Sequence, residues 1–377
     1  MKGNHQVTAL ALLALLGAGC STGPRDEARV LVLAVSATAN EPAPTPSAAV
    51  RAAVGAALGE GGTTLHLVLG GDDHPAEVRA EELALRRGDQ VEHDAGRRAR
   101  LTAEVTDRLA AELAGTGGTA THLDPLALLH HIARTPGPGT GVLVASGLQT
   151  TGPLATALLG WDRVGTPATT ELARQLGLVP DLRGKRVLFS GLGDTAPPQR
   201  PLPPQLRHRL VDFWLDLCRA GGAEDCAVDP EPLTARPVAT AGADLVPVPE
   251  PPVVPAGVPA PVLQLPSDVL FEPDRAVLVP EALPVLRQVA ERLPAGARIT
   301  LTGHTASVGP AASARELSLA RAGAVRDGLA GLGIPPDRVA VRGVGFDEPV
   351  VVDRDAAGAL VPAAAQRNRV VTLVVIP

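Results

Sequence analysis

The chain has 377 residues, which is enough for two domains with ordinary hydrophobic cores. Its formal net charge is −6 and 45% of its residues are hydrophobic, as is typical of a globular protein without the basic excess of a nucleic-acid binder. Aromatic residues make up only 2% and tyrosine is absent, so aromatic platforms that stack bases or sugars are not expected.

The first 19 residues have the organisation of an export signal. Lys2 supplies a positive charge, and residues 7–16 form an apolar stretch too short to span a bilayer. The run Leu16-Gly-Ala-Gly-Cys20 resembles a lipobox with its leucine one position early, and this resemblance implies a lipid on Cys20. Such a lipid would hold the exported protein on a membrane of the cell envelope, the outer membrane if the cell has one. The alternative is an ordinary cleaved signal followed by an incidental cysteine.

Apolar strands alternate with helical stretches between residues 28 and 228. Strands are predicted at residues 30–35, 65–69, 141–145 and 187–189, and helices at residues 47–58, 76–113, 126–134, 169–176 and 205–220. Continuous apolar runs such as residues 30–35 are typical of strands buried on both faces of a parallel sheet. We therefore expect an α/β domain, a parallel sheet with flanking helices, that weakly resembles von Willebrand factor A domains.

This α/β domain lacks the residues of the site classes that its fold suggests. A von Willebrand A metal site requires Asp-x-Ser-x-Ser after the first strand, but the residues before Ser36-Ala-Thr38 offer no carboxylate. The glycine turns at Gly184 and Gly191 do not match nucleotide-binding loops, and His130 and His131 are adjacent on a helix and cannot face one ligand. We therefore expect no metal, cofactor or catalytic residue here, and an unidentified partner protein is one candidate ligand of this domain.

Two cysteines remain after Cys20 is assigned to the lipid. Cys218 and Cys226 lie across the end of the last predicted helix of the α/β domain. Exported proteins meet oxidising conditions, so we predict a disulfide between them, worth about 2–4 kcal/mol. Two buried free thiols are the alternative.

Residues 229–261 contain ten prolines. Proline has no backbone donor for a sheet and favours an extended, semi-stiff chain. We expect this segment to be a linker between the α/β domain and a C-terminal domain.

The C-terminal domain is predicted over residues 262–377. After an opening segment at residues 262–271, a helix at 280–293, a strand at 299–302, a helix at 313–332 and strands at 339–343 and 370–376 give a β-α-β-α-β order. The residues that form its sequence pattern are Thr305, Gly309, Leu317-Ser-Leu-Ala-Arg-Ala322, Gly333-Ile-Pro335, Gly343, Gly345, Pro349, Asn368 and Arg369. This pattern resembles the OmpA-like peptidoglycan-binding domain, with its T-D-x-x-G, L-S-x-x-R-A, G-I-P and N-R-R-V signatures. The resemblance implies an α+β fold.

The resemblance also implies a ligand site. In the family, the aspartate after the threonine holds the ammonium group of a diamino acid in the peptidoglycan stem peptide, and the helix arginine holds its carboxylate. The site residues implied for this chain are Arg321, Arg369, Asn368 and Thr305, with backbone amides of the 305–309 turn assisting. Ala306 replaces the aspartate, and losing such a hydrogen bond costs about 1.5–3 kcal/mol, or roughly ten- to a hundredfold in affinity.

The sequence therefore predicts a non-catalytic envelope lipoprotein that tethers a membrane to peptidoglycan. Its parts are a signal peptide at residues 1–19, an α/β domain at 28–228, a linker at 229–261 and an OmpA-like domain at 262–377. The alternative is a protein interaction module in which the peptidoglycan site is degenerate. A wall hydrolase is disfavoured because the paired carboxylates or metal ligands of such chemistry do not stand out.

Overall fold

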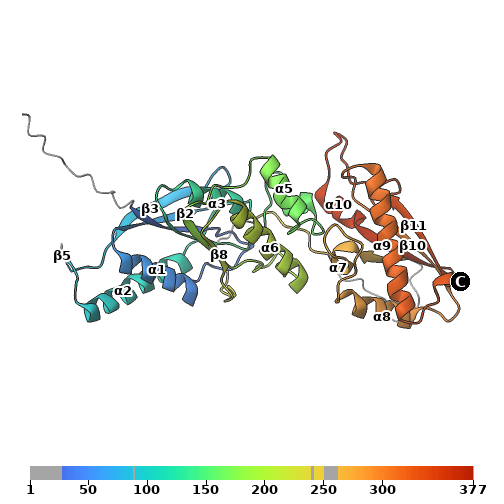
Figure 1. Cartoon of the computed structure of the whole chain (residues 1–377), viewed down its shortest axis with the longest axis horizontal. Coiled ribbons are helices and arrows are strands. Elements are labelled where there is room, and N and C mark those ends of the chain that lie inside the picture. Colours follow the sequence, from blue (N-terminus) through green and yellow to red (C-terminus); the bar gives the residue numbers. More distant parts are fainter. Residues whose placement is uncertain (1–27, 88–89, 239–241, 250–261, 377) are drawn as a thin grey trace, which may run out of the picture.

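The computed structural model describes residues 28–87, 90–238, 242–249 and 262–376. The predicted signal peptide and Cys20 lie outside these residues. Two sheet-containing domains lie side by side along the long axis of the molecule, the N-terminal one coloured blue to yellow-green and the C-terminal one orange to red (Figure 1). Within the described ranges, no helix combines the length and hydropathy that a membrane span requires.

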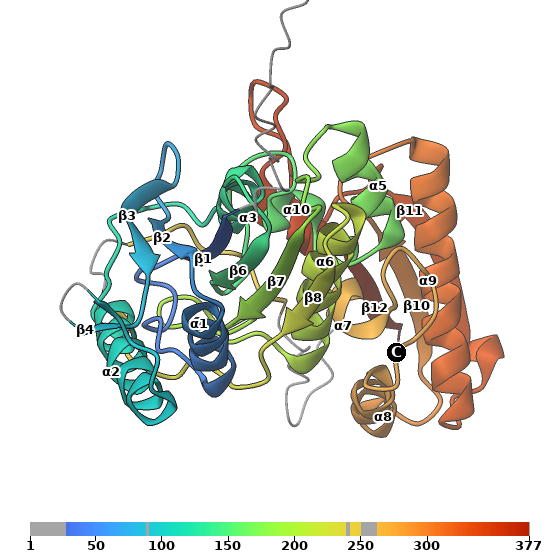
Figure 2. The same ribbon diagram turned by 60° about the vertical axis from the view of Figure 1, so that its left-hand side comes forward.

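The N-terminal domain is built on a six-stranded sheet with the order β3-β2-β1-β6-β7-β8, which Figure 2 shows edge to edge. Its strands are β1 (Arg29–Val35), β2 (Thr63–Leu69), β3 (Ala76–Leu83), β6 (Gly139–Val144), β7 (Lys185–Ser190) and β8 (Asp225–Val228). All neighbouring pairs are parallel except β2 and β3. Because the chain builds outward in both directions from β1 and β6, the strand order reverses between these two strands.

Helices cover both faces of this sheet. The helices of this domain are α1 (Ala48–Glu60), α2 (Ala95–Ala114), α3 (Pro125–Arg134), α4 (Thr156–Leu159), α5 (Pro167–Gln175) and α6 (Pro204–Ala220). Alternate residues of β1 enter two separate cores: Val30, Val32 and Ala34 pack with α3 and α6, and Leu31, Leu33 and Val35 pack with α1 and α2. The predicted burial of this strand on both faces is confirmed.

The prediction of a helix over residues 76–113 is wrong in its first half. Residues 76–83 form β3, and the short strands β4 (Arg86–Arg87) and β5 (Gln90–Val91) form a separate two-stranded sheet. The helix α2 begins at Ala95, where the Asp94 side chain accepts a hydrogen bond from the Arg97 amide at 2.9 Å. β3 is a mostly exposed edge strand rich in charged residues. Such charges protect sheet edges from further pairing, but in a local sequence window they also resemble the exposed face of a helix. The sheet is therefore mixed.

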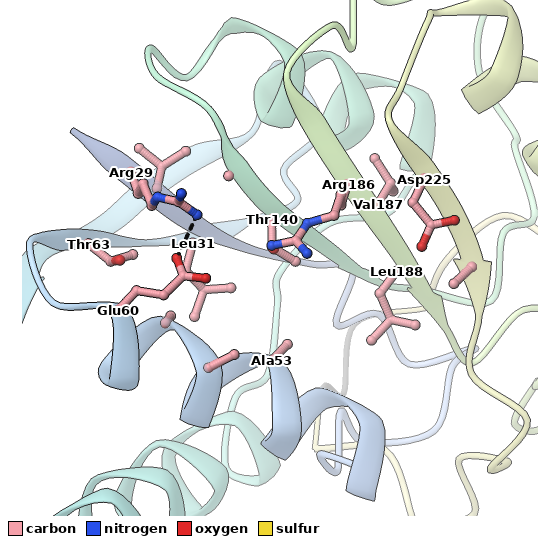
Figure 3. A pocket seen from close by; sticks show the side chains of 15 residues that line it. Arg29, Leu31, Ala53, Glu60, Thr63, Thr140, Arg186, Val187, Leu188 and Asp225 are labelled. Carbon is pink, nitrogen blue, oxygen red and sulfur yellow. Dashed lines mark hydrogen bonds and ion pairs between the residues drawn. The ribbon is translucent and has the colours of Figure 1, made fainter. Parts of the chain in front are cut away.

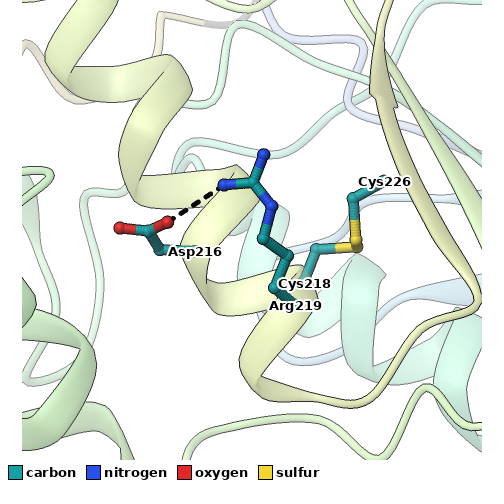
Figure 4. Close-up of a disulfide and its surroundings, with 4 residues drawn as sticks. All are labelled: Asp216, Cys218, Arg219 and Cys226. Carbon is teal, nitrogen blue, oxygen red and sulfur yellow. Dashed lines mark hydrogen bonds and ion pairs between the residues drawn. A yellow bond between two sulfur atoms is a disulfide. The ribbon is translucent and has the colours of Figure 1, made fainter.

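The structure pairs the two cysteines as predicted. Cys218 on α6 and Cys226 on β8 form a disulfide that ties the end of the helix to the edge strand, with their Cα atoms 6.2 Å apart (Figure 4). Beside it, Asp216 and Arg219 form an ion pair on the exposed side of α6 at 3.2 Å.

Replacing Cys218 and Cys226 together by alanine is expected to lower the free energy of unfolding of this domain by about 2–3 kcal/mol. The disulfide joins two residues eight positions apart, so it closes a short loop. This loop lowers the conformational entropy of the unfolded chain and thereby stabilises the folded state. Urea denaturation measures the effect, and the reduced wild-type protein should match the double variant. An unchanged denaturation midpoint would contradict a stabilising disulfide.

Part of the predicted linker packs against the N-terminal domain. The amide of Val246 donates to Gln199 Oε1 at 2.8 Å, and Gln199 Nε2 donates back to the Val246 carbonyl at 3.0 Å. The indole of Trp161 donates to the Pro247 carbonyl at 2.7 Å. This part of the predicted linker therefore lies along the surface of the N-terminal domain. Residues 250–261 lie outside the described residues.

The C-terminal domain has a four-stranded sheet with the order β11-β10-β12-β9. Its strands are β9 (Val262–Pro266), β10 (Arg298–His304), β11 (Val339–Gly345) and β12 (Val370–Ile376), and its helices are α7 (Ser267–Leu270), α8 (Ala282–Arg292), α9 (Ala311–Gly331), the 3-10 helix η1 (Pro336–Arg338) and α10 (Pro362–Asn368). The predicted β-α-β-α-β order is present, with the opening segment as β9, whereas α7 and α10 were not predicted. The long helix α9 packs closely on β10 and β11.

Two glycines permit that close packing. A Cβ atom on Gly303 would come within 2.0 Å of the Ser318 carbonyl oxygen, and one on Gly343 within 2.3 Å of the Leu319 amide nitrogen. Because only glycine fits at such distances, these positions fix the height of α9 above the sheet. Arg321 lies one turn further along this helix, so the same contact positions its guanidinium group.

Candidate functional site

Arg321 is a buried cation and not a solvated residue of the helix surface. Only 1% of its side chain is exposed. Its Nε donates to the Arg275 carbonyl at 3.0 Å, and its guanidinium carbon lies 5.4 Å from the centre of the Phe271 ring. The aromatic face and the carbonyl leave Arg321 Nη2 directed to a further acceptor, with which it makes no hydrogen bond.

Arg369 lies beside Arg321 in the folded domain. It follows α10, its side chain is 4% exposed, and its Nη2 donates to the Leu159 carbonyl of the N-terminal domain at 3.2 Å. Both guanidinium groups meet the carboxylate of Asp162, which also belongs to the N-terminal domain. Arg369 Nε lies 3.2 Å from Asp162 Oδ1, and Arg321 Nη2 lies 3.7 Å from Asp162 Oδ2. One carboxylate thus bridges the two predicted binding arginines.

The turn that carries Asp162 is fitted to the C-terminal domain. Gly160 has a φ of 79°, and a Cβ atom there would come within 2.3 Å of Arg369 Cζ, so the guanidinium packs against the bare backbone. The Asp162 carbonyl accepts from the Asp274 amide at 2.9 Å. Trp161 is buried and its carbonyl accepts from Arg209 Nη1 at 2.9 Å. Contacts from both domains therefore hold the turn in place.

More buried charges surround this contact. Arg209 on α6 also donates to the Phe271 carbonyl, and burial lowers its pKa. Burial, followed by the negative charge of Asp162, raises the pKa of Asp268 to about 6. The same two causes raise the pKa of Asp274. The interface thus concentrates cationic and acidic groups where water is largely excluded, and their interactions there are stronger than at the surface.

The remaining predicted site residues are arranged differently from expectation. The Thr305 amide donates to the Gly345 carbonyl at 2.8 Å, the Ser307 amide to Asp353 Oδ2 at 2.9 Å and the Val308 amide to the Ala306 carbonyl at 2.8 Å. The prediction that amides of this turn assist a ligand is therefore wrong for these three. The Thr305 hydroxyl is buried and has no hydrogen-bond partner among the described residues, so it stays a candidate.

Asn368 has a structural role. Its side chain is buried, its Oδ1 accepts from the Val351 amide at 3.0 Å, and its Nδ2 donates to the Val351 carbonyl at 2.8 Å. Because both ends of the amide bond to one residue, Asn368 holds the loop before α10. Its role as a binding residue stays a prediction.

Comparison with known proteins agrees with the C-terminal fold. Residues 270–359 match the model of the OmpA family. This segment is an OmpA family domain. Outer membrane protein A of Citrobacter freundii is 36% identical over 132 residues, which cover 32% of this chain and 56% of that protein. Outer membrane protein A of Shigella flexneri is 39% identical over 108 residues, which cover 26% of this chain and 31% of that protein. The chain thus spans just over half of the first relative and just under a third of the second.

Two solved structures are also similar to the chain. The peptidoglycan-associated lipoprotein from Burkholderia pseudomallei is 26% identical and has a TM-score of 0.24, with 29% of this chain and 88% of that chain covered. The cell wall anchor of the T6SS from Pseudomonas aeruginosa is 27% identical and has a TM-score of 0.26, with 30% of this chain and 80% of that chain covered.

Outside the OmpA-like domain, the place where a ligand is expected is filled by a side chain. Open α/β sheets bind ligands where the strand order reverses, which is here between the ends of β1 and β6. Glu41 is buried at this point and accepts from Ser36 Oγ at 2.7 Å, Thr38 Oγ1 at 2.9 Å and both the amide and Oγ of Ser146 at 2.7 Å. The hydroxyls of Ser36 and Thr38, which occupy the positions of the von Willebrand A metal ligands, thus donate to Glu41. No group of three possible metal ligands occurs in the described part of the chain.

Sequence reasoning missed Glu41 and Asp162. The signal for Glu41 was an acidic residue shortly after a buried strand, next to hydroxyl residues. Asp162 carried no signal, because its partners lie in the other domain.

A separate pocket lies at the other end of this sheet. It has a volume of about 220 Å³ and is lined by residues at the starts of the strands, among them Arg29, Arg186 and Asp225 (Figure 3). Arg29 pairs with Glu60 across its rim at 3.0 Å. Because ligands of α/β sheets bind at the opposite strand ends, this pocket is not the candidate site.

Proposed function

We propose that this protein is a non-catalytic component of the cell envelope whose OmpA-like domain associates with peptidoglycan. A lipid on Cys20 would hold the other end on a membrane, the outer membrane in a cell that has two. The OmpA family match and relatives named outer membrane protein A support the envelope assignment. The proposed wall-binding residues are Arg321 and Arg369, with Thr305 as a further candidate.

The observation that carries this proposal is the pair of buried arginines around one carboxylate. Arg321 and Arg369 are almost fully excluded from water, and each lies within 3.7 Å of an oxygen of Asp162. Buried guanidinium groups without a partner are costly, so such a pair selects an anion with two oxygens. Peptidoglycan stem peptides offer carboxylates of this kind.

Replacing Arg321 by alanine is expected to reduce binding to purified peptidoglycan sacculi at least about tenfold, because a charge-assisted contact to the wall carboxylate is lost. Co-sedimentation of the full chain, purified in detergent, measures the binding. The matched control is Arg326→Ala, which removes a more exposed arginine of the same helix paired with Asp327. Equal retention of the wild-type and Arg321→Ala proteins would contradict the proposed site, provided that circular dichroism shows both to be folded.

A second candidate function is a protein interaction module, favoured by Ala306 at the position of the family's aspartate. Ala306 is buried. Because alanine has no charged group, the carboxylate that binds the ammonium group in the family is missing from this site. In this case the α/β domain would bind a partner protein. The Ala306→Asp variant distinguishes the two functions: if sacculus binding appears only in this variant, the natural protein does not bind peptidoglycan.

A further inference from the structure

We infer that Asp162 is an internal ligand of the OmpA-like domain, so that the α/β domain closes the carboxylate site until the two domains separate. This inference rests on the proposed function of Arg321 and Arg369. It goes beyond that function because it assigns a regulatory role to the N-terminal domain, and because it predicts that the closed protein binds peptidoglycan weakly.

The position of Asp162 is that of a bound carboxylate. Its two oxygens are divided between Arg369 Nε, at 3.2 Å, and Arg321 Nη2, at 3.7 Å. Because the two arginine side chains are only 4% and 1% exposed, a second carboxylate cannot reach them while Asp162 is in place. A carboxylate of the wall polymer and Asp162 must therefore compete for the same cations.

The contact is built by both domains and is not a chance approach of two charged side chains. The carbonyls of Leu159 and Asp162 accept from Arg369 and the Asp274 amide of the OmpA-like domain. In the other direction, Arg209 of the α/β domain donates to the Phe271 carbonyl. The turn is thus hydrogen-bonded to the OmpA-like domain through the carbonyls of Leu159 and of Asp162 itself, as the backbone of a bound peptide would be.

The same geometry leaves this internal ligand replaceable. Neither Asp162 Oδ1 nor Arg321 Nη2 makes a hydrogen bond, so the carboxylate is held by ion pairs without the two parallel hydrogen bonds that arginine can make. The negative charge of Asp162 also raises the pKa of the neighbouring Asp268, which is a repulsion within the closed interface. A free carboxylate that binds Arg321 through two hydrogen bonds would remove both defects.

The test compares the full chain, purified in detergent, in four forms. They are the wild-type protein, Asp162→Asn, Asp162→Asn with Arg321→Ala, and Asp216→Asn, which removes an aspartate of the same domain from the surface pair with Arg219. Co-sedimentation with purified sacculi measures binding. Small-angle X-ray scattering without sacculi measures the radius of gyration, which reports domain separation independently of the wall.

The Asp162→Asn protein is expected to bind sacculi about tenfold more tightly than the wild type, because the apparent affinity rises with the fraction of molecules that are open. Its radius of gyration should increase, the Arg321→Ala addition should abolish the gain, and Asp216→Asn should behave as the wild type. An unchanged radius and unchanged binding in Asp162→Asn would overturn the internal ligand and leave the proposed function standing. Weaker binding in Asp162→Asn would also overturn it, since Asp162 would then contribute to the wall site. If no form binds sacculi but Asp162→Asn expands, the internal ligand is supported and the proposed function fails.

Discussion

Replacing Glu41 by alanine is expected to lower the free energy of unfolding of the α/β domain by about 3–5 kcal/mol. The buried carboxyl group accepts hydrogen bonds from the hydroxyls of Ser36 and Thr38 and from the amide and hydroxyl of Ser146. Each of these buried donors would lose its partner, and an unsatisfied buried donor costs about 1–3 kcal/mol, partly offset by water that enters the vacated space.

Urea denaturation followed by tryptophan fluorescence measures this effect. Both tryptophans of the chain, Trp161 and Trp214, lie in the α/β domain, so the signal reports that domain. The matched control is Glu60→Ala, because Glu60 is partly exposed and its ion pair with Arg29 is worth about 1 kcal/mol or less. If Glu41→Ala costs no more than Glu60→Ala, the strand ends of β1 and β6 do not depend on this side chain and the site there is open to a ligand.

Replacing Asp268 by asparagine is expected to stabilise the protein by up to about 3 kcal/mol at pH 7. Asp268 is buried against Asp162, Arg369, Arg209 and Gln366, and burial followed by the charge of Asp162 raises its pKa from the ordinary 3.8 to about 6. The folded protein therefore binds this proton more tightly than the unfolded chain. As the pH rises from about 4 to about 6, this residue makes the free energy of unfolding fall, by about 1.4 kcal/mol per unit of pKa difference.

The free energy of unfolding is thus expected to fall as the pH rises, whereas a carboxylate in a favourable ion pair makes it rise. Scanning calorimetry between pH 3 and pH 8 should show that Asp268→Asn and the wild type are equally stable below pH 4 and diverge above it. Asp327→Asn, which removes an exposed aspartate of the same domain, provides the control for a simple change in net charge. A wild-type protein that is more stable than Asp268→Asn at pH 7 would show that Asp268 is stabilised as an anion.

Local patterns predicted most of the elements that position the site. The apolar run of β1 and the register of Leu317-Ser-Leu-Ala-Arg-Ala322 identify a sheet buried on both faces and the helix that carries Arg321, because both depend on neighbouring residues. The edge strand β3 was mistaken for helix since its charges are the same in either structure. Its pairing with β2 is a tertiary property that a local window does not contain.

The same reasoning predicted only part of the candidate site. Arg321 and Arg369 stand at positions defined by family signatures, so their types could be predicted. Asn368 shares a signature with Arg369 but serves the backbone of Val351. Asp162 lies far away in the sequence, in a turn whose fit depends on Gly160 and on the packing of two domains. No periodicity or spacing encodes such a contact.

The most direct test of the central claim is a titration of the full-length wild-type protein with a soluble muropeptide that carries diaminopimelate, followed by small-angle X-ray scattering. If the muropeptide carboxylate displaces Asp162 from Arg321 and Arg369, the radius of gyration should rise with occupancy and reach the value of ligand-free Asp162→Asn. A radius that stays constant, while calorimetry on the same samples shows the muropeptide to be bound, would contradict the displacement.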